Sequence, residues 1–233
     1  MSHLRPFPAA PSARPVPGPA APDEGPVAPD AGRATLSEIW SAPGDAAAAA
    51  FALPSLARAG PVLWVQDRLS TREMGAPYAP ALCRALIHVR CTRAGDALAA
   101  MEAGLGCPAL AAVIGEIWGA PPQMSFVATQ RLALRAEAAG MPCWLVRRGA
   151  GPGPSAARMR WRVASLPSAP DPFDDRAPGA ARWRAELFRA RGVRPGTWIA
   201  THERAADRLH LAAPPADRAV DAPAGGRPRS AAG

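Results

Sequence analysis

The segment from Leu36 to Leu53, L-S-E-I-W-S-A-P-G-D-A-A-A-A-A-F-A-L, has the layout of a phosphate-binding loop: an apolar piece, a tight turn and a helix-forming alanine run. A working loop needs G-x-x-x-x-G-K-[ST], in which backbone N–H groups and a lysine hold phosphates and a hydroxyl holds Mg²⁺. When the motif is aligned on residues 41–48, alanines occupy the lysine and hydroxyl positions, and all 27 basic residues of the chain are arginine. The loop residues that remain are Ser41, Pro43, Gly44 and Asp45. We therefore expect a degenerate loop that binds no cofactor, with a plain strand–turn–helix as the alternative.

Two carboxylates stand at positions where an ATPase with a phosphate-binding loop would use them. Asp67 follows the apolar run at residues 61–65, and Glu116 falls near the end of the run at residues 109–117, with Gly115 as the other alignment. Asp67 would orient water and Glu116 would hold the Mg²⁺ water shell. Without the lysine and the hydroxyl we predict that the protein is not an enzyme. Residual anion binding at a helix N-terminus remains open, and so does the plainer interpretation that both carboxylates solvate strand ends.

Arginines dominate the last third of the chain. Two segments alternate between arginine and apolar residues, which is typical of half-exposed strands, and the period of two places the arginines of each segment on one face. These residues are Arg158, Arg160, Arg162, Arg182 and Arg184, followed by Arg189 and Arg191. Such a face suits a nucleic-acid backbone or an acidic partner. The alternative is a solvated face paired with Glu186 and nearby acids. Trp161 and Trp183 fall on the opposite side and are expected in the core.

Composition limits the other functions. The net charge is +8, which favours polyanionic partners. The four cysteines form no C-x-x-C pair and no histidine lies at ligand spacing, so we expect no metal site and reduced, buried thiols. No apolar run is long enough for a membrane helix and no signal peptide is evident, so a cytoplasmic protein without membrane contact is expected.

Proline content divides the chain. Residues 1–33 hold nine prolines, and residues 214–233 have the same character, so both are predicted to be disordered tails around a domain at residues 34–213. Inside the domain, short apolar runs at residues 61–65, 86–89, 109–117 and 143–146 alternate with helical segments at 97–104, capped by Asp96, and 126–139, capped by Ser125. Strands separated by helices predict a mostly parallel sheet flanked by helices. The strands after Gly153, at residues 158–163, 182–187, 197–201 and 209–212, predict an antiparallel C-terminal extension.

This order of segments resembles the RecA-like fold, and more closely the bacterial ImuA family. The most specific piece is G-D-A-L-A-A-M-E-A-G-L-G-C-P-A-L-A-A-V-I-G-E-I-W-G, residues 95–119. Five other pieces occur in the order in which the family has them: L-S-E-I-W-S-A-P-G-D, G-P-V-L-W-V-Q-D, S-A-A-R-M-R-W-R-V, R-W-R-A-E-L-F-R-A-R-G-V-R-P-G-T-W and L-H-L-A-A-P-P-A-D-R. Together they cover about residues 36–218.

The resemblance implies a RecA-like domain with degenerate Walker motifs and a non-catalytic role in translesion synthesis during the SOS response. It implies an ImuB-like protein and an error-prone DNA polymerase as partners, with RecA and single-stranded DNA as further candidates. A weak ATPase with residual nucleotide binding and a SulA-like cell-division inhibitor are the alternative functions.

Overall fold

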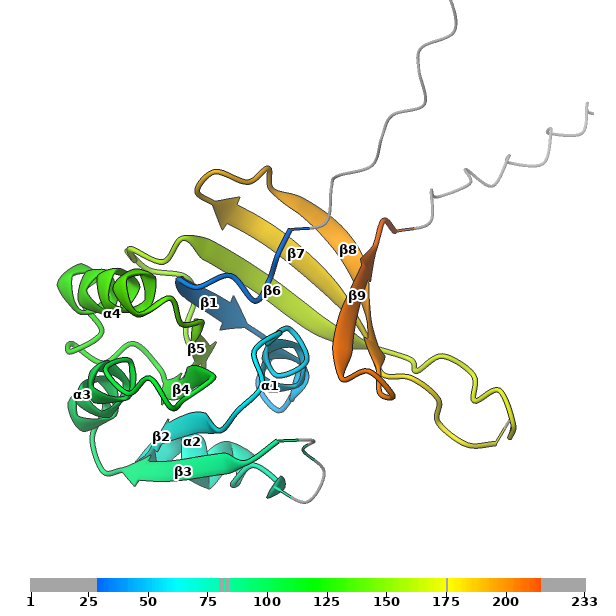
Figure 1. Ribbon diagram of the computed structural model, residues 1–233, viewed down its shortest axis with the longest axis horizontal. Coiled ribbons are helices and arrows are strands. Elements are labelled where there is room, and N and C mark those ends of the chain that lie inside the picture. Colours follow the sequence, from blue (N-terminus) through cyan, green and yellow to red (C-terminus); the bar gives the residue numbers. More distant parts are fainter. Residues whose placement is uncertain (1–28, 80–81, 83, 175, 215–233) are drawn as a thin grey trace, which may run out of the picture.

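The computed structural model describes residues 29–79, 82, 84–174 and 176–214, so most of each predicted tail, residues 1–28 and 215–233, lies outside it. The described residues form a nine-stranded sheet and four longer helices (Figure 1). The strands are β1 (Leu36–Trp40), β2 (Val62–Asp67), β3 (Leu86–Cys91), β4 (Ala112–Trp118), β5 (Cys143–Arg148), β6 (Met159–Leu166), β7 (Arg182–Ala190), β8 (Gly196–Glu203) and β9 (Arg208–Ala212). The helices are α1 (Ala47–Ala52), α2 (Arg68–Met74), α3 (Ala94–Gly104) and α4 (Phe126–Ala139).

The sheet confirms the predicted division into a parallel core and an antiparallel extension. Its order is β3-β2-β4-β5-β1-β6-β7-β8-β9. All pairs from β3 to β6 are parallel, and all pairs from β6 to β9 are antiparallel. The first strand of the chain, β1, therefore lies in the middle of the sheet between β5 and β6. The loop that follows β1 emerges at the carboxyl edge of the parallel strands, where α/β folds place their ligand sites.

Two hydrophobic clusters cover the two faces of the sheet. Helices α3 and α4 pack on one face, against side chains such as Val113 and Leu145. Helix α1 packs on the other face, where Phe51 contacts Trp144 and Trp161. Strands β6 to β9 curve around α1 and extend this second cluster (Figure 1). Trp161 is fully buried there, as predicted from its position opposite the arginines.

Local signals explain most helix ends. The Ser125 hydroxyl accepts a hydrogen bond from the Ala128 N–H and caps α4, and Gly140 ends that helix with a left-handed backbone, so both predicted boundaries are confirmed. The predicted cap of α3 is wrong. Arg93 holds the N-cap position, and Asp96 lies in the first turn, where its charge favours the helix dipole.

The sequence reasoning missed or shifted three other features. Helix α2 was not predicted, because its sequence R-L-S-T-R-E-M has no apolar periodicity. Strand β4 begins at Ala112, three residues after the predicted start, since the residues from Cys107 to Leu110 form a turn closed by a backbone hydrogen bond. Ala31, placed in the N-terminal tail, is buried in the core. In the described part of the chain, no helix is both long and apolar enough to cross a membrane.

Candidate functional site

The loop between β1 and α1 is closed by its own hydrogen bonds. The Ser41 hydroxyl donates to the Asp45 carbonyl (2.8 Å), and Gly44 provides the positive φ of +78° that the turn needs. The Asp45 carboxylate accepts from the Ala47 N–H at the start of α1 (2.8 Å) and from the backbone and side chain of Ser165 in β6 (3.0 and 2.7 Å). Although burial opposes the shift, the hydrogen bonds from Ser165 lower the pKa of Asp45. The N–H groups of Ala47 and Ser165 thus already donate to this carboxylate and are not free to bind an incoming anion.

A buried arginine also contacts this loop. Arg148, the last residue of β5, is 1% exposed, and its Nη1 donates to the Asp45 carbonyl (2.8 Å) and to the Ser41 hydroxyl (3.2 Å). Its Nη2 lies 3.6 Å from Oε1 of Glu116, which is also buried. Pro43 and Gly44 project into solvent on the outer side of the turn. The loop therefore has a cationic side chain beneath it, although the sequence offers none at the lysine position.

Together with Arg148, Glu116 belongs to a largely buried polar network that crosses four strands, β3, β2, β4 and β5. It accepts a hydrogen bond from Nε2 of Gln66 (2.7 Å), and the Gln66 oxygen lies 2.8 Å from Nε2 of His88. Burial raises the pKa of Glu116, and the charge of Arg148 opposes that rise. Burial is also the main cause of the lowered pKa of His88. The network neutralises itself, since each charged member has a partner inside the protein.

Asp67 has a structural role in this geometry. Its Oδ1 accepts from the Ser70 N–H (2.7 Å) and caps α2, while its Oδ2 accepts from the Trp118 N–H (3.2 Å) in the neighbouring strand. Both carboxylate oxygens are thus engaged by backbone donors. The sequence placed Asp67 and Glu116 at adjacent strand ends, and the structure brings them to the same edge of the sheet.

A second buried charge cluster lies on the opposite face, and the sequence reasoning missed it. Glu38 in β1 is fully buried, 3.0 Å from Nε of Arg160 and 3.7 Å from Nη1 of Arg147. Burial raises the pKa of Glu38, against the effects of a Ser155 hydrogen bond and the two arginines. Burial likewise lowers the pKa of Arg147. The signal available in the sequence was a lone glutamate inside the apolar run of β1, because a buried carboxylate requires a cationic partner.

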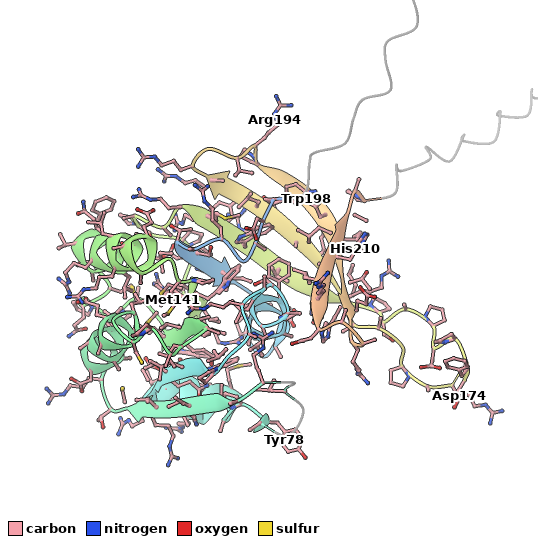
Figure 2. The ribbon with its side chains drawn as sticks, in the orientation of Figure 1. Tyr78, Met141, Asp174, Arg194, Trp198 and His210 are labelled. Carbon is pink, nitrogen blue, oxygen red and sulfur yellow. The ribbon has the colours of Figure 1, made fainter. Side chains whose placement is uncertain are left out.

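The predicted arginine face divides into paired and exposed members. Arg160 is 4% exposed and stacks over the Trp40 ring at 4.8 Å, so it lies inside the protein. Arg158 forms a short pair with Glu137 (2.6 Å), and Arg162 pairs with Glu186 (3.3 Å) while remaining half exposed. The more accessible arginines are Arg184, Arg189 and Arg191, with Arg182 partly buried. Arg194 continues this group at the β7–β8 turn, where it points into solvent (Figure 2).

The β1–α1 loop and two of the accessible arginines meet at one cavity. It has a volume of about 510 Å³ and is lined by Trp40 and Ser41 on one side and by Arg162 and Arg184 on the other. Strands β6 and β7 pair here with Arg162 opposite Glu186 and Ala164 opposite Arg184. The cavity is also lined by Glu186, which pairs with Arg162, so Arg184 is the guanidinium group of this lining that has no ion pair with another described residue.

The described residues contain no group of three or more histidine, cysteine or acidic side chains that could hold a metal ion. The prediction of buried thiols holds for Cys143, whose pKa burial raises, but is wrong for Cys107, which is exposed. Cys83 lies outside the described residues.

Comparison with known proteins identifies the family. Protein ImuA of Caulobacter vibrioides, from strains NA1000 / CB15N and ATCC 19089 / CIP 103742 / CB 15, is 35% identical to the chain over 183 residues, covering 73% of each protein. The chain belongs to the ImuA family. A search of protein-family profiles found no match. In this ImuA-family protein, Arg148 contacts the β1–α1 loop, and Arg162 and Arg184 line the cavity beside it.

Proposed function

We propose that this ImuA-family protein acts without catalysis, as an accessory protein in translesion synthesis and mutagenesis induced by DNA damage. It holds an ImuB-like protein and an error-prone DNA polymerase on a RecA-like frame. Family membership supports the pathway. The position of the β1–α1 loop at the centre of a parallel sheet, followed by an antiparallel extension, supports the RecA-like frame with degenerate Walker motifs.

The observation that carries the non-catalytic role is the closed loop. Asp45 caps the first N–H of α1, and Arg148 donates to the Asp45 carbonyl and the Ser41 hydroxyl. A phosphate at this loop would have to displace these contacts and would meet no lysine or Mg²⁺-binding hydroxyl. Asp67, which would orient the attacking water, uses both oxygens for backbone hydrogen bonds.

Contact with DNA belongs to the same proposal and rests on the exposed arginines. Arg162 and Arg184 line the cavity beside the loop, and Arg189 and Arg191 are exposed farther along the chain. This row of guanidinium groups supports contact with the backbone of single-stranded DNA. Arg160 is buried and pairs with Glu38, so it is not part of the proposed DNA-binding surface.

Affinity purification tests the proposed partners. The full chain, expressed with the ImuB-like protein and the error-prone polymerase of its own genome, should recover both, and it should show no ATP turnover alone or in the complex. The matched control is the same bait with the division ring protein, which a SulA-like inhibitor would bind. Recovery of the division ring protein without the ImuB-like protein, or ATP turnover by the purified chain, would overturn the proposal.

Salt-dependent binding to single-stranded DNA tests the arginines. The double variant Arg162→Ala/Arg184→Ala should bind more weakly and lower the slope of log K against log salt by about 1.4, because each lost phosphate contact removes about 0.7. The control Arg72→Ala/Arg135→Ala removes the same charge from α2 and α4. Equal slopes in the two double variants would refute the assigned surface.

A further inference from the structure

The loop between β6 and β7 carries a phenylalanine that is exposed to solvent. Phe173 is 95% exposed, whereas the exposed fraction of the other large apolar residues on the described surface ranges from 43% to 73%. Figure 2 places the neighbouring Asp174 at the far end of this loop, away from the body of the domain. An aromatic side chain of this size is normally buried, since water penalises its apolar surface. An exposed phenylalanine on a projecting loop therefore needs an explanation.

Hydrogen bonds connect several of the described residues of this loop. At its neck, the Ala169 N–H donates to the Ala180 carbonyl (2.9 Å), and a β-bridge joins Pro170 to Pro178. At its tip, Oδ1 of Asp171 accepts from the N–H groups of Phe173 (2.9 Å) and Asp174 (3.2 Å). The tip thus combines one apolar ring with the carboxylates of Asp171 and Asp174 in a hydrogen-bonded turn, and the exposed Arg176 follows, its N–H donating to Asp174 (2.9 Å). A turn ordered by hydrogen bonds loses less entropy on binding, which favours it as an anchor.

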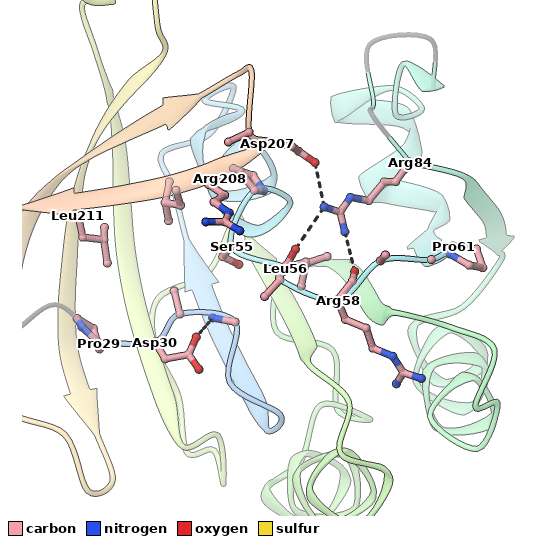
Figure 3. Close-up of a pocket in the computed structure, with 18 of the residues that line it drawn as sticks. Pro29, Asp30, Ser55, Leu56, Arg58, Pro61, Arg84, Asp207, Arg208 and Leu211 are labelled. Atoms are coloured by element: carbon pink, nitrogen blue, oxygen red, sulfur yellow. Dashed lines mark hydrogen bonds and ion pairs between the residues drawn. The ribbon is translucent and has the colours of Figure 1, made fainter.

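The same chain carries a pocket with the complementary chemistry. Its volume is about 650 Å³, and it lies between the segment after α1 and the β8–β9 turn (Figure 3). The partly buried Leu209 and Leu211 form part of its lining, together with the acidic residues Asp30 and Asp207. Pockets of roughly 300–1,000 Å³ with such a lining accept anchoring side chains.

Two arginines without a carboxylate partner line this pocket. Arg84 is already satisfied by Asp207 at 2.9 Å and by two backbone carbonyls. Arg58 donates only to the Pro108 carbonyl, and Arg208 is exposed. Among the residues that the structure describes, neither of these two has an acidic side chain within ion-pair distance. Their positive charge is complementary to the negative charge of Asp171 and Asp174 beside Phe173.

We infer that this protein associates with a second copy of itself, with the Phe173 loop of one copy in the Leu209–Leu211 pocket of the other. Phe173 is the apolar anchor, and Asp171 and Asp174 of one copy face Arg58 and Arg208 of the other. The exposure of Phe173 shows that the loop does not fill the pocket of its own chain. The inference is independent of the proposed role in mutagenesis.

Sedimentation velocity of the full chain tests the inference, at concentrations from about 1 μM to about 1 mM, the affinity range of a small interface. The wild type should associate with increasing concentration and less so at high salt. Phe173→Ala should weaken association at least about 30-fold, as expected for a central aromatic anchor. Phe126→Ala is the matched control, because it removes a half-exposed phenylalanine from α4.

A mixing experiment separates this contact from any other. The Arg58→Glu/Arg208→Glu variant keeps the loop and loses the pocket charges, whereas Phe173→Ala keeps the pocket and loses the anchor. Each should be monomeric alone, and an equal mixture should form a 1:1 dimer. All the substituted residues are exposed, so tryptophan fluorescence should show an unchanged fold. A monomeric wild type across the range, or Phe173→Ala that associates like the wild type, would overturn the inference.

Discussion

Replacing Arg148 with methionine tests the contact that closes the β1–α1 loop. The substitution keeps most of the side-chain volume and removes the charge that faces Glu116 at 3.6 Å and the donors to Asp45 and Ser41. Glu116 is 2% exposed, so its carboxylate would stay buried without a cation. Removing one partner of a buried pair costs about 3–5 kcal/mol of unfolding free energy. This is a large share of the roughly 5–15 kcal/mol that stabilise a typical domain.

The loss should depend on pH with a definite sign. Burial raises the pKa of Glu116 above its ordinary value of 4.5, so the folded state keeps the proton longer than the unfolded state does. The free energy of unfolding therefore falls as pH rises from the pKa of Glu116 in the unfolded state to its higher pKa in the folded state. Arg148 limits that fall because it favours the ionised form. In Arg148→Met the pKa of Glu116 should rise further, and each additional unit removes about 1.4 kcal/mol above this range of pH.

Urea unfolding at pH 5 and pH 8, followed by fluorescence of the buried tryptophans, measures both effects. Arg148→Met should be less stable than wild type at both pH values, and the deficit should be larger at pH 8. The double variant Arg148→Met/Glu116→Gln should lose most of this additional pH dependence. Equal stability of wild type and Arg148→Met, or an unchanged pH slope in the double variant, would refute the buried pair.

Three further substitutions probe other parts of the structure by the same unfolding assay. Glu38→Gln should cost about 3 kcal/mol, because Arg147 and Arg160 would remain buried without their carboxylate; no change would refute the second cluster. Gly115→Ala should cost about 1–3 kcal/mol, since an added Cβ would clash with the Met101 side chain, whereas Gly151→Ala, with open space around it, should be neutral. Ser125→Ala should cost about 1 kcal/mol through loss of the α4 cap, and an unchanged unfolding midpoint would contradict the observed hydrogen bond.

Local patterns were sufficient to predict an α/β protein with a mostly parallel sheet and an antiparallel extension. The continuous apolar runs that became β2 and β5 predicted buried parallel strands, and the alternation of arginine with tryptophan predicted the half-exposed β6 and β7. These patterns depend only on the period of the side chains along a strand. Helix α2 was missed because its sequence has no apolar periodicity.

The site was harder to predict because its contacts join residues far apart in the chain. Arg148 reaches the loop from β5, and Glu38 meets Arg160 across 122 positions of sequence. Period two placed Arg160 on the arginine face correctly, but it gave no information on whether a carboxylate on the neighbouring strand would pair with it. That pairing follows from the order of β1 and β6 in the sheet, which the local pattern does not encode.

The frequency of damage-induced mutations in living cells tests the proposed function most directly. In a strain that lacks this gene, ultraviolet-induced mutation should fall close to the level of untreated cells, and a plasmid copy of the wild type should restore it. Undiminished induced mutation in the deletion strain would contradict the role in translesion synthesis.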